Sequence, residues 1–349
     1  MSETPGWSSP DQPSNQPPPQ QQPQHGPQYG YTMPPPPPTI KPGVIPLRPL
    51  GLGEIIDGAI TTMRRHPKIL IGGAAVVAAI TQIVSLVVQL PFLSALTDVA
   101  AIDPNTATPE QVLDQFAATV PSAIVGTGVE ALLVLLGTVF LSGFITVVAG
   151  HAVLGRPVTF AQAWEEFKPR LLPLLGATLL YGLMIGVVIF AFVALAVVSQ
   201  SVPVFILATI AGVVIAIGLW VVFSLVTPAL VLERCGVGTA FGRSRKLVNG
   251  AWWRTFGILL VAALITGVIN SIVVVPFQLM GMAATGFSTD PAATLNVIYL
   301  VLVTIGAIIA STITLPFSSA VTVLVYVDRR MRAEGMDIEL QRAAGHGGS

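Results

Sequence analysis

The polar side chains that could do chemistry in this chain stand inside long apolar stretches. Glu130 is the one acid embedded in such a stretch, and Gln89 and Gln278 lie near the ends of two others. Gln82 and Asn270 lie deeper in the same two stretches. An unpaired carboxylate in lipid takes up a proton rather than staying charged. These five residues are therefore candidates for proton coupling, or for contact with an ion or substrate inside a membrane.

Each of these residues also fits a structural role. Residues 131–149 provide 19 uncharged positions, enough to cross a bilayer, so Glu130 lies at the outer headgroup level if the span begins after it. Buried amides such as Gln82 and Asn270 commonly join helices through hydrogen bonds worth about 0.6 kcal/mol each. The functional and the structural interpretation both stay open at this point.

Signatures of catalysis and of cofactor binding are absent from the sequence. There is no His/Cys metal spacing, no Gly-x-Ser-x-Gly elbow and no phosphate-binding loop. We therefore expect no catalytic residue, no metal, no cofactor, no nucleic-acid partner and no enzymatic activity. The single cysteine, Cys235, excludes an internal disulfide and is expected as a reduced thiol.

A basic loop at residues 234–254 is the second candidate site. Cations at a lipid surface favour anionic headgroups by about 1 kcal/mol each. Orientation of the chain during membrane insertion explains the same cations without any ligand. The candidate contacts with anionic lipid are Arg234, Arg243, Arg245, Lys246 and Arg254.

The distribution of all 17 Lys and Arg residues predicts the elements that position these groups. Residues 69–155, 171–233 and 255–328 contain none of them. An Arg or Lys at mid-bilayer costs about 2.5–3.5 kcal/mol on insertion scales. With 53% hydrophobic and only 10% charged residues, the chain is predicted to be an all-α integral membrane protein. Its three cation-free blocks predict three hairpins returning to one basic side.

Six transmembrane helices follow from this pattern, with both termini in the cytoplasm and the protein in the cell membrane. The last span is longer than a bilayer requires, and Pro316 within it marks a kink or boundary. The predicted spans are 69–90, 124–149, 171–198, 204–231, 255–279 and 295–327.

Each hairpin is preceded by a short amphipathic helix, which we expect in the headgroup plane on the cytoplasmic side. The three helices begin near Leu52, Phe160 and Ala240, and Thr159 and Gln162 have capping-box spacing. Three aromatic residues near the inner ends of spans suit an interfacial belt: Trp252, Trp253 and Tyr326.

An internal repeat connects the first and third units at an offset of 185 residues. Gly51 and Gly53 match Gly236 and Gly238, and the pair Pro91-Phe92 matches Pro276-Phe277. We therefore interpret the domain, residues 48–328, as repeated units of one amphipathic helix and one hairpin. Internal repeats are common in transporters.

Two tails flank this domain. Residues 1–47 hold 15 of the 29 prolines and many glutamines, a composition typical of disordered, extended chains. This tail either binds nothing in particular or docks on a protein partner with an aromatic groove. Residues 329–349 are interpreted as a basic, then polar, cytoplasmic tail.

Several stretches resemble the glycerophosphoryl diester phosphodiesterase membrane domain family. They are residues 48–59, 64–67, 228–233, 243–252 and 329–340, of which Gly53-Glu-Ile-Ile-Asp-Gly-Ala59 is the most specific. The Pro-rich tail makes the chain similar to mycobacterial proteins described as proline- and glycine-rich transmembrane proteins. The resemblance implies a helical membrane module of the actinobacterial type, without a catalytic domain and without catalytic residues to carry over.

The leading hypothesis is a non-enzymatic multi-pass membrane protein that acts as a scaffold or accessory factor. Its partners would be the lipid bilayer, anionic lipids and a protein that binds the Pro-rich tail. A transporter of a small solute or lipid is the alternative, with Glu130 and the amides contacting the cargo. A membrane partner of a separately encoded phosphodiesterase is the second alternative.

Overall fold

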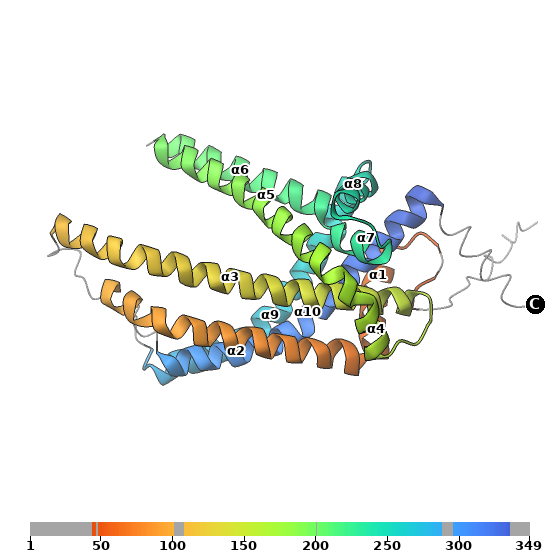
Figure 1. Cartoon of the computed structure of the whole chain (residues 1–349), viewed down its shortest axis with the longest axis horizontal. Helices are drawn as coiled ribbons and strands as arrows, with labels where there is room; N and C mark the ends of the chain where they lie inside the picture. Colours follow the sequence, from red (N-terminus) through yellow and green to blue (C-terminus); the bar gives the residue numbers. More distant parts are fainter. Residues whose placement is uncertain (1–43, 47, 101–107, 200, 288–295, 336–349) are drawn as a thin grey trace, which may run out of the picture. The chain divides into compact units, whose positions relative to one another are not determined.

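The computed structural model describes residues 44–46, 48–100, 108–199, 201–287 and 296–335, and the elements described are all helices (Figure 1). Six of them are long and apolar enough to cross a membrane, which confirms the predicted helical membrane class. The elements are α1 (Leu52–Arg65), α2 (Pro67–Ala100), α3 (Pro109–Val153), α4 (Phe160–Phe167), the 3-10 helix η1 (Lys168–Arg170), α5 (Leu171–Val198), α6 (Val202–Phe223), α7 (Val226–Leu232), α8 (Val237–Val248), α9 (Trp252–Ala284) and α10 (Val297–Glu334).

Helices α2 and α3 are longer than the spans predicted within them. They contain 34 and 45 residues, so at about 1.5 Å per residue they extend for roughly 50 and 70 Å. A hydrocarbon core is only about 30 Å thick. The spans predicted at 69–90 and 124–149 marked only the apolar part, whereas the flanking Ala, Leu, Gln and Glu residues continue the helix. Both helices are therefore longer than the hydrocarbon core of a bilayer, and their extra length lies at the end opposite the cations.

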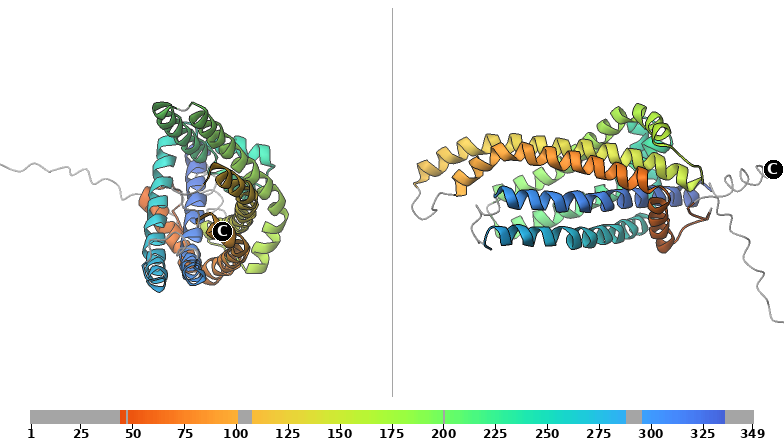
Figure 2. Two further views of the ribbon diagram at one scale, coloured as in Figure 1. Left: turned by 90° about the vertical axis from the view of Figure 1, so that its left-hand side faces the viewer. Right: turned by 90° about the horizontal axis from the view of Figure 1, so that it is seen from below.

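Consecutive long helices pack along each other. Helix α2 lies against α3, α5 against α6, and α9 against α10, as both views of Figure 2 show. These are the pairs that the three predicted hairpins require. Their placement across a membrane stays a prediction.

Helices α1 and α4 begin where the sequence predicted, at Leu52 and Phe160, whereas α8 begins at Val237, before the predicted Ala240. Thr159 caps α4: its hydroxyl accepts a hydrogen bond from the Gln162 backbone N–H at 3.3 Å, and its own N–H donates to the Gln162 side chain at 3.0 Å. Gly51 and Gly236, matched by the internal repeat, are the extended N-cap residues of α1 and α8. The capping box is confirmed, and the two repeat copies start a helix at the same place.

The apolar faces of the short helices pack partly on protein rather than wholly on lipid. In α1, Ile55 and Ala59 are fully buried, whereas Leu52 and Ile60 stay exposed. The same division holds in the other two, whose buried residues are Ala163 and Phe167 in α4 and Ala240, Ser244, Leu247 and Val248 in α8. Only the exposed residues remain for contact with headgroups.

The single predicted span at 204–231 is two helices in the structure. Helix α6 ends at Phe223 and α7 begins at Val226, with a turn at Ser224 and Leu225. Pro228 accounts for the break, because proline has no N–H and its ring clashes with the carbonyl four residues earlier. That carbonyl belongs to Ser224. Periodicity and hydropathy do not register such an interruption.

Helix α10 contacts α1, α2, α3, α7, α8 and α9. It continues through Glu334, past the boundary at 328 where we placed a cytoplasmic tail, and ends at Gly335 in the left-handed conformation. Its buried residues concentrate between Pro316 and Met331. The packed core therefore lies in the half of the domain that carries the cations. The opposite half exposes large apolar side chains on α5, α6 and α9, as lipid-facing helices do.

Candidate functional site

A hydroxyl-lined cavity of about 280 Å³ lies among α3, α5, α6, α7 and α10. This volume is close to the lower end of the about 300–1,000 Å³ typical of small-molecule pockets. Of its 19 lining residues, ten carry a hydroxyl group and none is charged: Thr138, Ser142, Thr146, Thr178, Tyr181, Ser224, Thr227, Ser318, Ser319 and Thr322. The accessible wall is mainly apolar with hydroxyl groups set into it, so the cavity suits an occupant that has both polar and apolar surface.

Most of these hydroxyls use their proton locally. Six donate to a carbonyl of their own helix, at 2.6 Å for Thr146 and 2.8 Å for Ser224. A hydroxyl has one proton and two lone pairs, so the oxygens that face the cavity are left as acceptors. The Tyr181 hydroxyl differs, because it is buried without a hydrogen-bond partner among the residues that the structure describes. The cavity therefore offers several acceptors, and the phenol of Tyr181 can also donate.

The break between α6 and α7 forms part of the cavity wall. Ser224, Thr227 and Pro228 all line it. The interruption is held from outside by Ser244 of α8, whose buried hydroxyl donates to the carbonyl oxygen of Val222 at 2.7 Å. Non-helical backbone at membrane depth is tolerated where it is buried in protein or lines a polar cavity. Broken helices of this kind form the substrate sites of many transporters.

The lining chemistry selects the class of occupant. With no Lys, Arg or His in the wall, an anion would face only oxygen lone pairs. With no carboxylate, a cation would have to shed its water for neutral oxygens alone. An uncharged molecule with several O–H or N–H groups satisfies the acceptors, and its C–H surface can pack on Trp220 and Phe223, which also line the cavity. The geometry thus suits a small polyol-like solute or headgroup.

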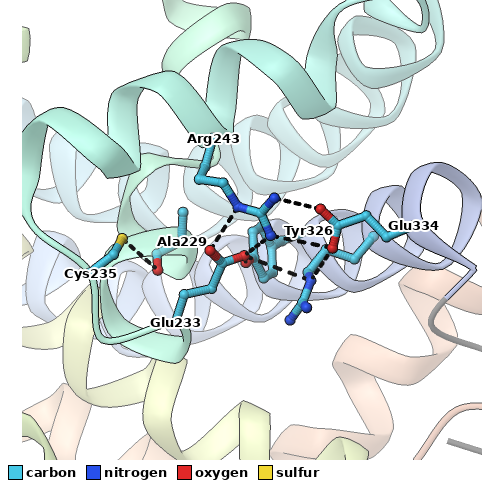
Figure 3. Close-up of polar contacts among 7 residues, drawn as sticks. Ala229, Glu233, Cys235, Arg243, Tyr326 and Glu334 are labelled. Carbon is cyan, nitrogen blue, oxygen red and sulfur yellow. Dashed lines mark hydrogen bonds and ion pairs between the residues drawn. The ribbon is translucent and has the colours of Figure 1, made fainter. Parts of the chain in front are cut away.

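A ring of charged side chains joins α7, α8 and α10 at the basic end of the domain (Figure 3). Arg243 donates to both carboxylate oxygens of Glu233, each at 2.7 Å, and to Glu334 at 2.5 Å. Tyr326 donates a further hydrogen bond to Glu233. Arg330 donates to Glu334 at 3.0 Å. Every charge in the ring is paired with an opposite one. Such a closed set of ion pairs stabilises the packing of α7, α8 and α10.

Burial alone would raise the pKa of the Glu233 carboxyl. The hydrogen bonds from Arg243 and Tyr326, with the positive charges of Arg243 and Arg330, outweigh burial and lower this pKa. The same contacts raise the pKa of the Arg243 guanidinium, led by its hydrogen bonds to Glu233 and Glu334. Both groups are therefore charged at neutral pH.

A second cluster is centred on Asp328, whose side chain is fully buried. Its carboxylate accepts from the Leu50 backbone N–H at 2.8 Å and from Arg332 at 2.9 Å, and it pairs with Arg254 at 3.4 Å. Both arginines also donate to the Leu50 carbonyl, at 2.6 and 3.0 Å. The start of α1, the start of α9 and the end of α10 are thereby tied together.

Two residues near these clusters, Tyr326 and Cys235, were the subject of sequence predictions. The prediction that Tyr326 is an interfacial anchor is wrong, because its side chain is 1% exposed and its hydroxyl is bonded to Glu233. Apolar neighbours bury the ring while the hydroxyl meets a carboxylate, which hydropathy cannot foresee. Cys235 is a free, half-buried thiol, and burial raises its pKa. It donates to the Ala229 carbonyl at 3.6 Å.

The intramembrane candidates whose side chains the structure describes do not form this site. Glu130 lies in α3 and Gln89 in α2, but their side chains are outside the described part of the structure. Gln82 on α2 is half-buried, Gln278 on α9 is half-buried and Asn270 on α9 is exposed. None of these last three lines the hydroxyl cavity. Their role in ion or substrate contact stays a prediction.

The candidate lipid-binding cations separate into two groups. Arg243 and Arg254 are engaged in the two charged clusters. Arg245, Lys246 and Arg234 are exposed, and Arg234 has only a 3.9 Å ion pair with Glu166. Only the second group keeps its charge available for a headgroup.

Sequence reasoning missed the ten hydroxyl residues, although part of the signal was present. Thr138, Ser142 and Thr146 recur every four positions on α3, and Ser318 and Thr322 do so on α10. A four-residue recurrence places side chains on one helix face. Hydroxyl stripes in two apolar spans would have predicted two walls of the cavity, but not that the walls meet.

No curated protein and no solved structure matches the chain. A family model does match residues 50–328, whose two end residues, Leu50 and Asp328, are hydrogen-bonded to each other. The match does not connect the chain with the glycerophosphoryl diester phosphodiesterase membrane domain, so that resemblance stays an expectation. The matched family is described as Domain of unknown function (DUF7847), and the chain belongs to it.

Proposed function

We propose that this protein binds a small, uncharged, polyol-like solute inside the membrane and transports it. The observation that carries the proposal is the hydroxyl-lined, charge-free cavity at the break between α6 and α7. Burying a hydroxyl without a hydrogen bond costs about 1–3 kcal/mol in proteins. A solute with several O–H groups would recover this cost for the lining oxygens, the unpartnered Tyr181 hydroxyl included.

Two prolines favour movement of the cavity walls. Pro228 accounts for the break before α7, and Pro316 removes a backbone hydrogen bond inside α10 beside the lining residues Leu315 and Ser318. Transporters commonly open and close a central site by shifting interrupted helices. Proline therefore weakens two helices, α7 and α10, that line the same cavity. This favours a site that can open and close, as transport requires, over a site that binds permanently.

Membrane placement is part of the same proposal. By the positive-inside rule, the end carrying the charged clusters faces the cytoplasm, which puts the cavity in the inner half of the bilayer. No catalytic step is included. The scaffold role remains a hypothesis from the Pro-rich tail, residues 1–43 of which lie outside the described structure.

The test is solute entry into vesicles reconstituted with the full-length chain. A size series of uncharged polyols is applied as an osmotic shock, and reswelling is followed by light scattering. We expect faster reswelling than in empty vesicles for one size class, and loss of this effect in Ser142→Ala/Thr322→Val.

The matched control is Thr266→Val on α9. Thr266 also donates to carbonyls of its own helix but does not line the cavity. Reswelling that never exceeds that of empty vesicles for any polyol, or that falls equally in Thr266→Val, contradicts the proposal.

A further inference from the structure

A second pocket, of about 400 Å³, lies at the basic end between the last turns of α3, helix α7 and α10. Its polar wall carries three guanidiniums and one carboxylate, from Arg156, Arg234, Arg330 and Glu166, together with the imidazole of His151. The rest of the wall is mainly aliphatic and includes leucines and valines. It therefore combines an excess of positive charge with an apolar surface in one site.

The three guanidiniums keep donors free. Arg156 has no ion pair within the described part of the chain, and Arg330 engages only its Nε, with Glu334 at 3.0 Å and Glu233 at 3.7 Å. Arg234 is held at 3.9 Å from Glu166 by one terminal nitrogen. Arginine presents its N–H groups as a planar fork that matches phosphate oxygens. Three arginines that line one pocket and keep N–H groups unpaired among the described residues provide donors suited to a phosphate group.

Local backbone geometry places Arg234 at the pocket. Its φ of 52° lies in the left-handed region, which is uncommon for a residue other than glycine. Arg170 supports this conformation by donating to the Arg234 carbonyl at 3.2 Å. In addition, Nδ1 of His151 is buried without a partner among the described residues. Its Nε2 lies 3.2 Å from the Glu166 carboxylate, so the imidazole is placed at the pocket wall beside Glu166.

The aliphatic wall identifies the source of the phosphate. Leu154, Leu232 and Val327 line the pocket at the ends of their helices, where a membrane boundary is expected. A free inorganic phosphate would gain nothing from these side chains, whereas the glycerol and first acyl carbons of a phospholipid would bury apolar surface on them. The site thus fits a lipid headgroup with its adjoining chain.

We propose that this pocket binds the phosphate of an anionic phospholipid, held by Arg156, Arg234 and Arg330 against the aliphatic wall. The site differs from the predicted lipid contact of loop 234–254, because only Arg234 is shared. It is also independent of the hydroxyl cavity, whose lining residues are all different.

The test measures retention of phosphatidylglycerol by the full-length chain in mild detergent, using native mass spectrometry and titration with the lipid. We expect saturable binding, stronger than that of phosphatidylcholine. The affinity should fall about fivefold for each guanidinium removed in Arg156→Gln and Arg156→Gln/Arg234→Gln. Arg64→Gln/Arg65→Gln is the matched control, because it removes the same charge from exposed positions on α1 outside the pocket.

Three outcomes would overturn the site. Unchanged phosphatidylglycerol binding in Arg156→Gln/Arg234→Gln is the first. An equal loss in the Arg64→Gln/Arg65→Gln control would show attraction to the whole basic surface instead. The third is loss of phosphatidylglycerol binding when inorganic phosphate is added at the same concentration as the lipid. That result would identify a soluble phosphate as the occupant. The single variant Arg156→Gln is expected to fold normally, since the exposed Arg156 side chain makes no ion pair within the described residues. It therefore tests the site even if the double variant misfolds.

Discussion

The hydroxyl cavity and the charged clusters at the basic end are both polar, but their groups are satisfied differently. Around Glu233 and Asp328, carboxylates and guanidiniums from distant segments are paired with one another. In the cavity, hydroxyls donate within their own helices and leave acceptors facing an open volume. Groups that satisfy each other hold the fold together, whereas groups left incomplete are available to a ligand.

The comparison has a consequence for mutation. Loss of one member of a closed cluster leaves buried charges without partners, which is costly to stability. Loss of one hydroxyl from the cavity removes at most a local hydrogen bond to a neighbouring carbonyl. Substitutions in the two regions should therefore separate stability from solute binding.

Asp328→Ala is expected to have the largest effect. The substitution leaves Arg254, Arg332 and the Leu50 N–H without their acceptor, and breaking a buried pair commonly costs about 3–5 kcal/mol. Denaturant unfolding in detergent measures the loss. Asp57→Ala, on the exposed side of α1, is the control and should change little. Equal unfolding midpoints for the two variants would break the comparison.

Glu233→Gln is expected to cost about 1.5–3 kcal/mol at neutral pH, the usual range for hydrogen bonds to a charged group. The pKa of Glu233 is lowered in the folded state, so its stabilisation is present above the ordinary value of 4.5. It is lost as the pH falls through the folded pKa. Unfolding measured from neutral to acidic pH should show wild type and variant converging in acid. A constant difference would mean that Glu233 does not act as a carboxylate.

Ser244→Ala should have a smaller effect, about 1 kcal/mol, since it removes the hydrogen bond to the carbonyl of the half-buried Val222 at the helix break. Hydrogen exchange of residues 224–226 should become faster. Thr239→Ala, at an exposed position of the same helix, serves as the control. Unaltered exchange at the break would show that Ser244 does not hold it.

Tyr181→Phe should have the smallest effect on stability, within about 0.5 kcal/mol of wild type, because its hydroxyl has no partner to lose. Solute-dependent stabilisation and vesicle reswelling should nevertheless weaken. A large loss of stability without added solute would show that this hydroxyl belongs to the structural set, contrary to the comparison.

Local properties of the chain predicted the framework. Long cation-free segments predicted six membrane-length helices, and Thr159 with Gln162 predicted where α4 begins. These features depend on a few neighbouring residues and on the cost of charge in lipid. The interruption at Ser224 was missed because hydropathy averages over Pro228, although proline chemistry contains the signal.

The candidate sites depended on tertiary structure. The sequence by itself determined a helical membrane protein with its cations at one end, because solvation of each residue type acts independently of partners. It did not determine that Tyr326 meets Glu233, or that hydroxyls from positions 138 to 322 surround one cavity. These contacts join residues that are far apart in the sequence. Only the packing of the helices decides which of them face each other. The same packing decides which cations are paired and which stay free for a lipid.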